Sequence, residues 1–185
     1  MRVGYANLVT GVRLLLVAAV AALAVHPDLR VAGWLAVLLS TITACLDAVD
    51  GPIARRTGTE SAFGARFDME VDALLIMVLA ALAWQWDKAG AWVLLSGLLR
   101  YAFVAVGWLF PSLRQPLPPS LRRKAVCVVQ IVGLIIVLGP IVRPPVSTTL
   151  AAVGLALLGY SFLVDIVWLL ARRPTARGRA FPSWS

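Results

Sequence analysis

Apolar stretches recur along the whole chain, each about 20 residues long, and only short breaks separate them. A helix of this length crosses the roughly 30 Å hydrocarbon core of a bilayer. Hydrophobic residues make up 61% of the sequence, a share that few soluble domains reach. The sequence therefore predicts an all-α integral membrane protein with six transmembrane helices in one domain, residues 1–171. The spans are expected at about Ala6–Val25, Val31–Asp50, Phe67–Trp86, Ala91–Phe110, Ala125–Pro140 and Thr148–Leu170.

The basic residues between these spans are distributed unequally. If the N-terminus is assigned to one side and the sides alternate, twelve of the 17 Lys and Arg residues share that side and three lie opposite. This asymmetry places both termini and residues 47–72 in the cytoplasm, and the protein in the cytoplasmic membrane. The same pattern accounts for the net charge of +8 without nucleic acid, for which the chain has no motif. The twelve are Arg2, Arg55, Arg56, Arg66, Arg114, Arg122, Arg123, Lys124, Arg172, Arg173, Arg177 and Arg179.

The two ends of the chain carry further signals. A basic residue, an apolar stretch and the run Ala22-Leu23-Ala24 imitate a secretory signal peptide. Arg13 interrupts that stretch, which is long enough to span from Tyr5, so we favour a retained first helix. Residues 172–185 are rich in Arg with Pro and Ser, and we expect a basic, mobile cytoplasmic tail in contact with anionic lipid.

Four aspartates, Asp47, Asp50, Asp68 and Asp72, lie where the second span ends and the third begins. Spacings of three and four place each pair on one helix face, and two helices joined by a short connection lie side by side. The four carboxylates can therefore converge at the cytoplasmic membrane edge. Because ionised carboxylates are costly there unless paired or metal-bound, they predict a site for one or two Mg²⁺ or Mn²⁺ ions. A solvated acidic loop that caps two helices could account for Asp68 alone.

The residues among these aspartates suit a phosphate ligand. Gly51 and Gly64 lack side chains, so a nucleotide can approach the backbone there. Arg55 offers a fork of N–H donors that matches phosphate oxygens. Carboxylate-bound metal ions beside an arginine are typical of phosphoryl transfer.

The segment reads D-x2-D-G-x2-A-R-x8-G-x3-D-x3-D, with every fixed position present, and it resembles the signature of the CDP-alcohol phosphotransferase family. The resemblance implies six transmembrane helices around a polar cavity that opens to the cytoplasm. It also implies transfer of a substituted phosphate group from a CDP-linked donor to an alcohol, with release of CMP. A homodimer is usual among relatives. Pro52 and Glu70 depart from the commonest pattern: the proline could end or kink the second helix, and helical geometry turns the glutamate away from Asp68 and Asp72.

The resemblance also assigns roles to residues. Asp47, Asp50 and Asp68 correspond to metal ligands, and Asp72 borders the metal ions and acts as the base on the acceptor hydroxyl. Gly51, Arg55 and Gly64 correspond to positions that bind the CDP group. The first span has the spacing N-x2-T-x2-R at Asn7, Thr10 and Arg13. In the family, residues with this spacing often line the nucleotide pocket.

Residues for the acceptor alcohol are less clearly marked. The cluster Arg122, Arg123 and Lys124 lies where the family places cations that bind a phosphate on the acceptor, although a positive-inside loop explains it equally well. Arg100, inside an apolar run, could face the acceptor or extend to an interface. Asp165, in the last span, could pair with an intramembrane arginine or lie near an interface.

The sequence thus predicts a metal-dependent enzyme of phospholipid biosynthesis that transfers a phosphatidyl group from CDP-diacylglycerol to a small polar alcohol. The basic residues favour an acceptor that bears phosphate, such as glycerol 3-phosphate or an inositol phosphate. CDP-choline or CDP-ethanolamine with a lipid acceptor would use the same aspartates. A divalent-cation or proton-coupled carrier would explain the intramembrane carboxylates, but not the glycines and Arg55.

Overall fold

A computed structural model of the chain describes residues 5–26, 28–57, 62–109 and 120–171. The described residues form α-helices and two short 3₁₀ helices, without strands. The 3₁₀ helices are η1 (Leu23–Val25) and η2 (Ala91–Leu94). The α-helices are α1 (Tyr5–Ala22), α2 (Leu29–Thr57), α3 (Ala62–Gln85), α4 (Leu95–Leu109), α5 (Leu121–Leu138) and α6 (Val146–Ala171).

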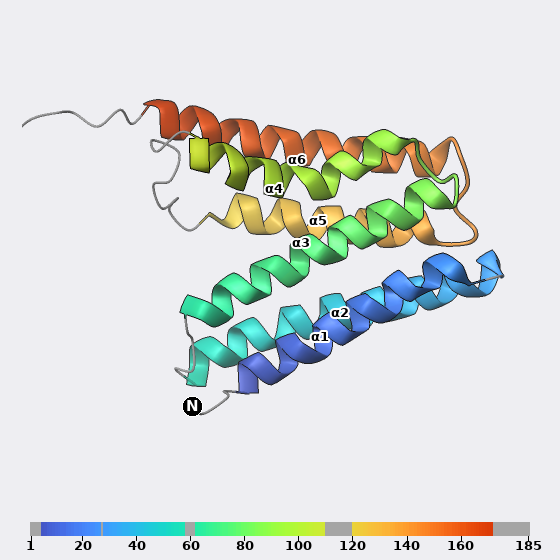
Figure 1. The fold of residues 1–185 in the computed structure, drawn as a ribbon, viewed down its shortest axis with the longest axis horizontal. Helices are drawn as coiled ribbons and strands as arrows, with labels where there is room; N and C mark the ends of the chain where they lie inside the picture. The colour runs from blue at the N-terminus through green and yellow to red at the C-terminus, as the bar shows by residue number, and fades with distance from the viewer. Residues whose placement is uncertain (1–4, 27, 58–61, 110–119, 172–185) are drawn as a thin grey trace, which may run out of the picture.

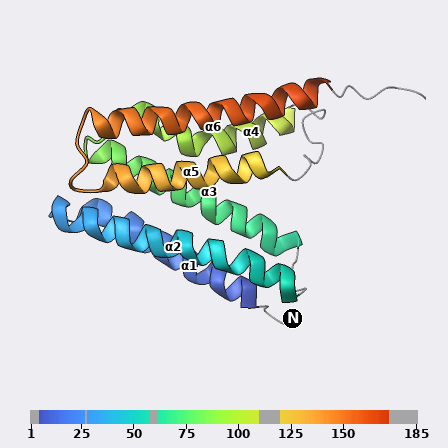
Figure 2. The same cartoon turned by 180° about the vertical axis from the view of Figure 1, so that it is seen from behind.

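The helices lie roughly along one direction (Figures 1 and 2). Helices α1 and α2 pack against each other, α5 packs against α6, and α3 lies between these pairs, in contact with α1, α4 and α5. The end of α2, the start of α3 and the start of α5 all lie at one end of the bundle (Figure 1). Side chains of the consecutive helices α2 and α3 can therefore meet side chains of α5, which is distant in sequence.

The core follows the central helix α3. Its side chains Val71, Leu75, Leu79 and Ala83 are buried, which places apolar residues at nearly every turn along one face. They pack with buried residues of the flanking helices, such as Val17, Val20, Ala36, Leu134 and Leu138. This continuous apolar packing fixes α3 relative to both helix pairs, and so fixes the polar residues at its start.

Helix α2 begins at a capped end and continues farther than its sequence suggests. The carboxylate of Asp28 accepts hydrogen bonds from the backbone N–H groups of Arg30 (2.8 Å) and Val31 (3.2 Å). The bonds from Val31 and then Arg30 hold the pKa of Asp28 below its usual range. At the other end, α2 runs on to Thr57, so of the two outcomes predicted for Pro52 an end of the helix is wrong. The helix continues although the proline removes one helical hydrogen bond and its ring crowds the preceding turn.

Helix α3 ends in a Schellman motif. The backbone N–H of Lys88 donates to the carbonyl of Ala83 at 2.9 Å, and that of Asp87 donates to Trp84 at 3.1 Å. Asp87 has a φ of 54°, the left-handed conformation that glycine adopts without steric cost. The motif turns the chain back toward η2.

We expect the substitution Asp87→Gly to stabilise the protein by about 0.5–1 kcal/mol, because glycine relieves the left-handed strain. A β-branched residue is poorly tolerated at such a φ, so Asp87→Val should destabilise by a similar or larger amount. Thermal unfolding of both variants in detergent measures the two effects. A lower midpoint for Asp87→Gly than for the original chain would contradict the expectation.

Two of the described helices are long and apolar enough to cross a membrane, within Leu29–Ala48 and Val146–Leu169. Val9–Val25 and Ala91–Ala102 form shorter apolar helical segments. Helix α3 carries Asp68, Glu70 and Asp72 in its first half, and α5 carries Arg122, Arg123 and Lys124 in its first turn. These charges lower the mean hydropathy of the two helices.

Candidate active site

Three of the four predicted aspartates converge. Asp47 projects from α2, and Asp68 and Asp72 project from one face of α3, where a spacing of four residues aligns them. One carboxylate oxygen from each lies within 4.8 Å of the others. The spacing argument therefore predicted this cluster correctly. The side chain of Asp50 lies outside the described residues.

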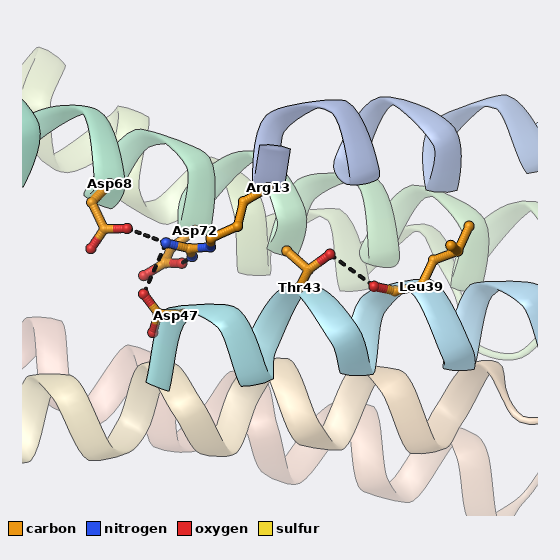
Figure 3. Close-up of polar contacts among 6 residues, drawn as sticks. All are labelled: Arg13, Leu39, Thr43, Asp47, Asp68 and Asp72. Atoms are coloured by element: carbon orange, nitrogen blue, oxygen red, sulfur yellow. Dashed lines mark hydrogen bonds and ion pairs between the residues drawn. The ribbon is translucent and has the colours of Figure 1, made fainter. Parts of the chain in front are cut away.

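Arg13 of α1 occupies the centre of this acidic cluster (Figure 3). Its side chain is fully buried. One terminal nitrogen, Nη1, lies 3.0 Å from Asp47 Oδ1 and also pairs with Asp68. The other, Nη2, lies 2.5 Å from Asp72 Oδ1. A planar guanidinium can bridge several carboxylates in this way, so Arg13 joins three helices at one point.

The sequence indicated Arg13 only as part of a short motif and did not predict its central position. The signal that could have found it is a charged residue within an apolar span, which needs a partner of opposite charge. Thr43 lies one turn before Asp47 on α2. Its hydroxyl donates to the carbonyl of Leu39 at 2.8 Å, so it uses no acceptor of the acidic cluster (Figure 3).

A cavity of about 600 Å³ adjoins the acidic cluster. Asp47, Asp68 and Asp72 line one part of it, and further residues of α3 line it together with residues of α4, α5 and α6. Three of the four cations predicted for the acceptor lie in its wall, namely Arg100, Arg123 and Lys124. Carboxylates and cations thus border one space, as a site for a phosphate group and its metal ions requires.

Ion pairs hold several of these cations. Arg100 Nη2 lies 2.5 Å from Oε1 of Glu70, which agrees with the prediction that Glu70 turns away from the acidic cluster. The fourth predicted cation, Arg122, lies 2.5 Å from the buried Asp165, and Arg123 lies 3.6 Å from the same oxygen. Asp165 therefore pairs with basic residues at the start of α5.

The residues predicted for the CDP group are only partly described. Thr10 is buried on α1, one turn from Arg13 and on the same face, and Gly64 lies on α3 one turn before Asp68. Asn7 belongs to α1, and Gly51 and Arg55 belong to α2. The surroundings of these three residues lie outside what the structure describes. Residues 172–185, predicted to form a basic tail, also lie outside them.

Several residues of the cavity wall were not predicted. Ser96, Cys127 and Ser161 line it together with apolar side chains. Cys127 lies in an apolar part of α5, and packing of α5 against α3 brings it to the same cavity as the aspartates. The group of potential metal ligands among the described residues nevertheless consists of carboxylates only.

The fold and the site together define a helical protein of the membrane class, with a cluster of carboxylates that offers oxygen ligands to a cation. Beside this cluster lies a cavity lined by both acidic and basic residues. The family model for CDP-alcohol phosphatidyltransferase matches residues 3–166, and the chain belongs to this family. The sequence signature had predicted this membership. A search of curated proteins finds no significant match. The family transfers a phosphatidyl group from a CDP-alcohol to an acceptor.

Proposed function

We propose that the protein is a Mg²⁺- or Mn²⁺-dependent phosphatidyltransferase that uses CDP-diacylglycerol and a small phosphate-bearing alcohol in phospholipid synthesis. The observation that carries this proposal is the acidic cluster Asp47, Asp68 and Asp72 on the wall of a cavity that also contains Arg100 and Lys124. Carboxylates alone would suit many cation sites. Cations that line the same cavity complement the negative charge of a ligand that carries phosphate.

The proposed setting is a bilayer crossed by six helices, with the acidic cluster toward the cytoplasm. The outward faces of the bundle support this arrangement. Large apolar side chains are exposed on α2, α5 and α6, among them Trp34, Leu38, Val132, Ile136 and Leu163. Exposed apolar surface of this extent fits contact with lipid tails. The unequal distribution of basic residues between the two ends of the spans supports this orientation.

The acidic cluster fits divalent cations by charge and by donor type. Three ionised carboxylates and the Arg13 guanidinium have a formal charge of −2, which one divalent ion balances. Asp47, Asp50, Asp68 and Asp72 would hold one or two ions through oxygen, the donor that Mg²⁺ and Mn²⁺ prefer. When bound, the ions neutralise the pyrophosphate of the donor and the charge that develops on CMP.

The chain's own residues arrange the rest of the reaction. The CDP group would bind beside the acidic cluster, in contact with Asn7, Thr10, Gly51, Arg55 and Gly64. Asp72 belongs to the acidic cluster and also lines the cavity, so we assign it the role of accepting the proton from the acceptor hydroxyl. The alcohol oxygen bonds to the phosphorus distal to cytidine as the bridging P–O bond breaks, and CMP leaves with the bridging oxygen.

The cations across the cavity would select the acceptor. Arg123 and Lys124 lie at the start of α5, at the end of the bundle where the acidic cluster lies (Figure 1). Asp165 holds Arg122 and Arg123 by ion pairs, so their guanidinium groups are oriented before a ligand arrives. A phosphate on the acceptor would neutralise this wall, as glycerol 3-phosphate or an inositol phosphate would.

Metal-dependent CMP release tests the proposed function. The purified full-length chain in detergent, supplied with Mg²⁺, CDP-diacylglycerol and a panel of alcohols with and without phosphate, should release CMP fastest with a phosphate-bearing alcohol. Chelation of the metal should stop the release. CDP-choline with diacylglycerol tests the alternative donor, and cation uptake into vesicles tests a carrier. Absence of CMP release with every donor and alcohol would refute a transferase.

A further inference from the structure

The cavity extends beyond the acidic cluster and the cations to a second region. From Asp72 the α3 wall continues to Ala73 and Ile76, roughly 6 Å farther along the helix axis. Opposite, α4 contributes Ser96, one turn from Arg100 on the same face. Helix α6 contributes Ser161, one turn from Asp165. The two serines thus lie deeper in the bundle than the charged residues of the cavity.

Apolar side chains line the same cavity as the two hydroxyls. They include Ile76, Ile131 and Leu158. Ser96 is 2% exposed and Ser161 is 3% exposed, so both side chains are shielded from bulk water. A few isolated polar groups in an apolar wall are the usual means by which a pocket orients a ligand.

Ser96 has no hydrogen-bond partner within the described protein. Its Oγ is buried and unpaired. Other hydroxyls in this chain bond to the carbonyl one turn earlier, as Thr41 does to Val37 at 2.7 Å and Thr149 to Pro145 at 3.0 Å. An unpaired buried hydroxyl is unfavourable, and a ligand hydroxyl in the cavity would satisfy it.

Two further features of α4 support a polar ligand at this position. The Nε of Arg100, one turn from Ser96 in the same cavity wall, is also buried without a partner. Next to Ser96, Gly97 lets α4 approach α3 closely, because a Cβ there would lie 2.8 Å from the Cα of Met77. The close contact fixes the position of Ser96 relative to Asp72.

We propose that Ser96 and Ser161 bind hydroxyl groups of the acceptor and that the acceptor is a polyhydric alcohol, with at least one hydroxyl besides the one that reacts. This inference rests on the proposed function. The reacting hydroxyl lies at Asp72, a phosphate on the acceptor lies at Arg123 and Lys124, and the additional hydroxyl reaches Ser96. An acyl chain in the same region would leave the serine hydroxyl unsatisfied.

The test compares acceptors that differ by one hydroxyl. With Mg²⁺ and CDP-diacylglycerol, CMP release is measured for glycerol 3-phosphate and inositol 1-phosphate, and for their analogues that lack one non-reacting hydroxyl. The original chain should show a lower KM for one intact acceptor than for its deoxy analogue. Ser96→Ala should raise the KM for the intact acceptor about threefold to tenfold, the value of one hydrogen bond, and remove most of the discrimination. Ser161→Ala should act in the same direction.

Ser40→Ala is the matched control. Ser40 on α2 is also fully buried with an unpaired Oγ, but it is not among the residues that line the cavity. The Ser40→Ala enzyme should therefore keep the KM values of the original chain for both substrates. Thermal unfolding separates a binding role from a structural one, since loss of an unpaired hydroxyl should not lower the midpoint.

Three results would overturn the inference and leave the transferase intact. They are an unchanged acceptor KM in Ser96→Ala, a changed KM for CDP-diacylglycerol alone, and a preference for an acceptor with a single hydroxyl. The first would show that Ser96 does not contact the acceptor, and the second would assign the region to an acyl chain. Absence of CMP release with every alcohol would remove the proposed function as well.

Discussion

Replacing Asp72 by asparagine should reduce CMP release at least about 1000-fold, the largest effect that we expect of any single substitution. Asparagine has the same shape but cannot accept the proton of the acceptor hydroxyl at neutral pH. It also removes one charged oxygen from the acidic cluster that Asp72 forms with Asp47 and Asp68. Because both losses concern the reacting centre, the fall should appear in kcat more than in either KM.

The initial rate of CMP release at saturating donor and acceptor measures this effect. Asp87→Asn is a suitable control, since Asp87 is an exposed carboxylate at the opposite end of α3 and should leave the rate unchanged. An Asp72→Asn enzyme with more than about a tenth of the original rate would exclude Asp72 as the base, because removing a general base typically costs 100-fold or more.

The sequence predicted the acidic cluster because helical spacing is a local property. Spacings of three and four residues fix a shared face wherever the helix lies, so Asp68 and Asp72 could be paired before their surroundings were known. The family signature extended this reading to the whole chain, and the family match bears it out. The described residues form six α-helices at about the positions of the recurring apolar stretches, and two of these helices are long and apolar enough to cross a membrane.

Contacts between distant helices could not be predicted in the same way. Arg13 and Asp72 are 59 residues apart, and nothing in either segment states which face of α1 meets α3. The ion pair of Arg122 and Asp165 could not be predicted for the same reason. Nor could the positions of Ser96 and Cys127, which line the same cavity as the acidic cluster. These pairings depend on how the buried side chains of α1, α3 and α5 pack, which one sequence does not reveal.

The central position of Arg13 leads to the second large effect. Arg13→Gln should lower the free energy of unfolding by about 3 kcal/mol when no divalent ion is present, because it leaves three carboxylates close together without their counter-charge. Added Mg²⁺ or Mn²⁺ should recover a large part of this loss, since the ions bind the same oxygens. Arg13→Lys should lose less, because a lysine keeps the charge but cannot bridge three carboxylates.

Thermal unfolding in detergent, with chelator and with Mg²⁺, measures both parts of this prediction without relying on catalysis. Arg30→Gln provides the control, because Arg30 is exposed and an exposed arginine contributes little to stability. If Arg13→Gln unfolds at the original temperature in chelator, the guanidinium does not hold the cluster together. If its midpoint falls equally with and without Mg²⁺, Arg13 supports the packing of α1 against α3 rather than the charge balance. Recovery by the divalent ion alone therefore identifies Arg13 as the counter-charge of the acidic cluster.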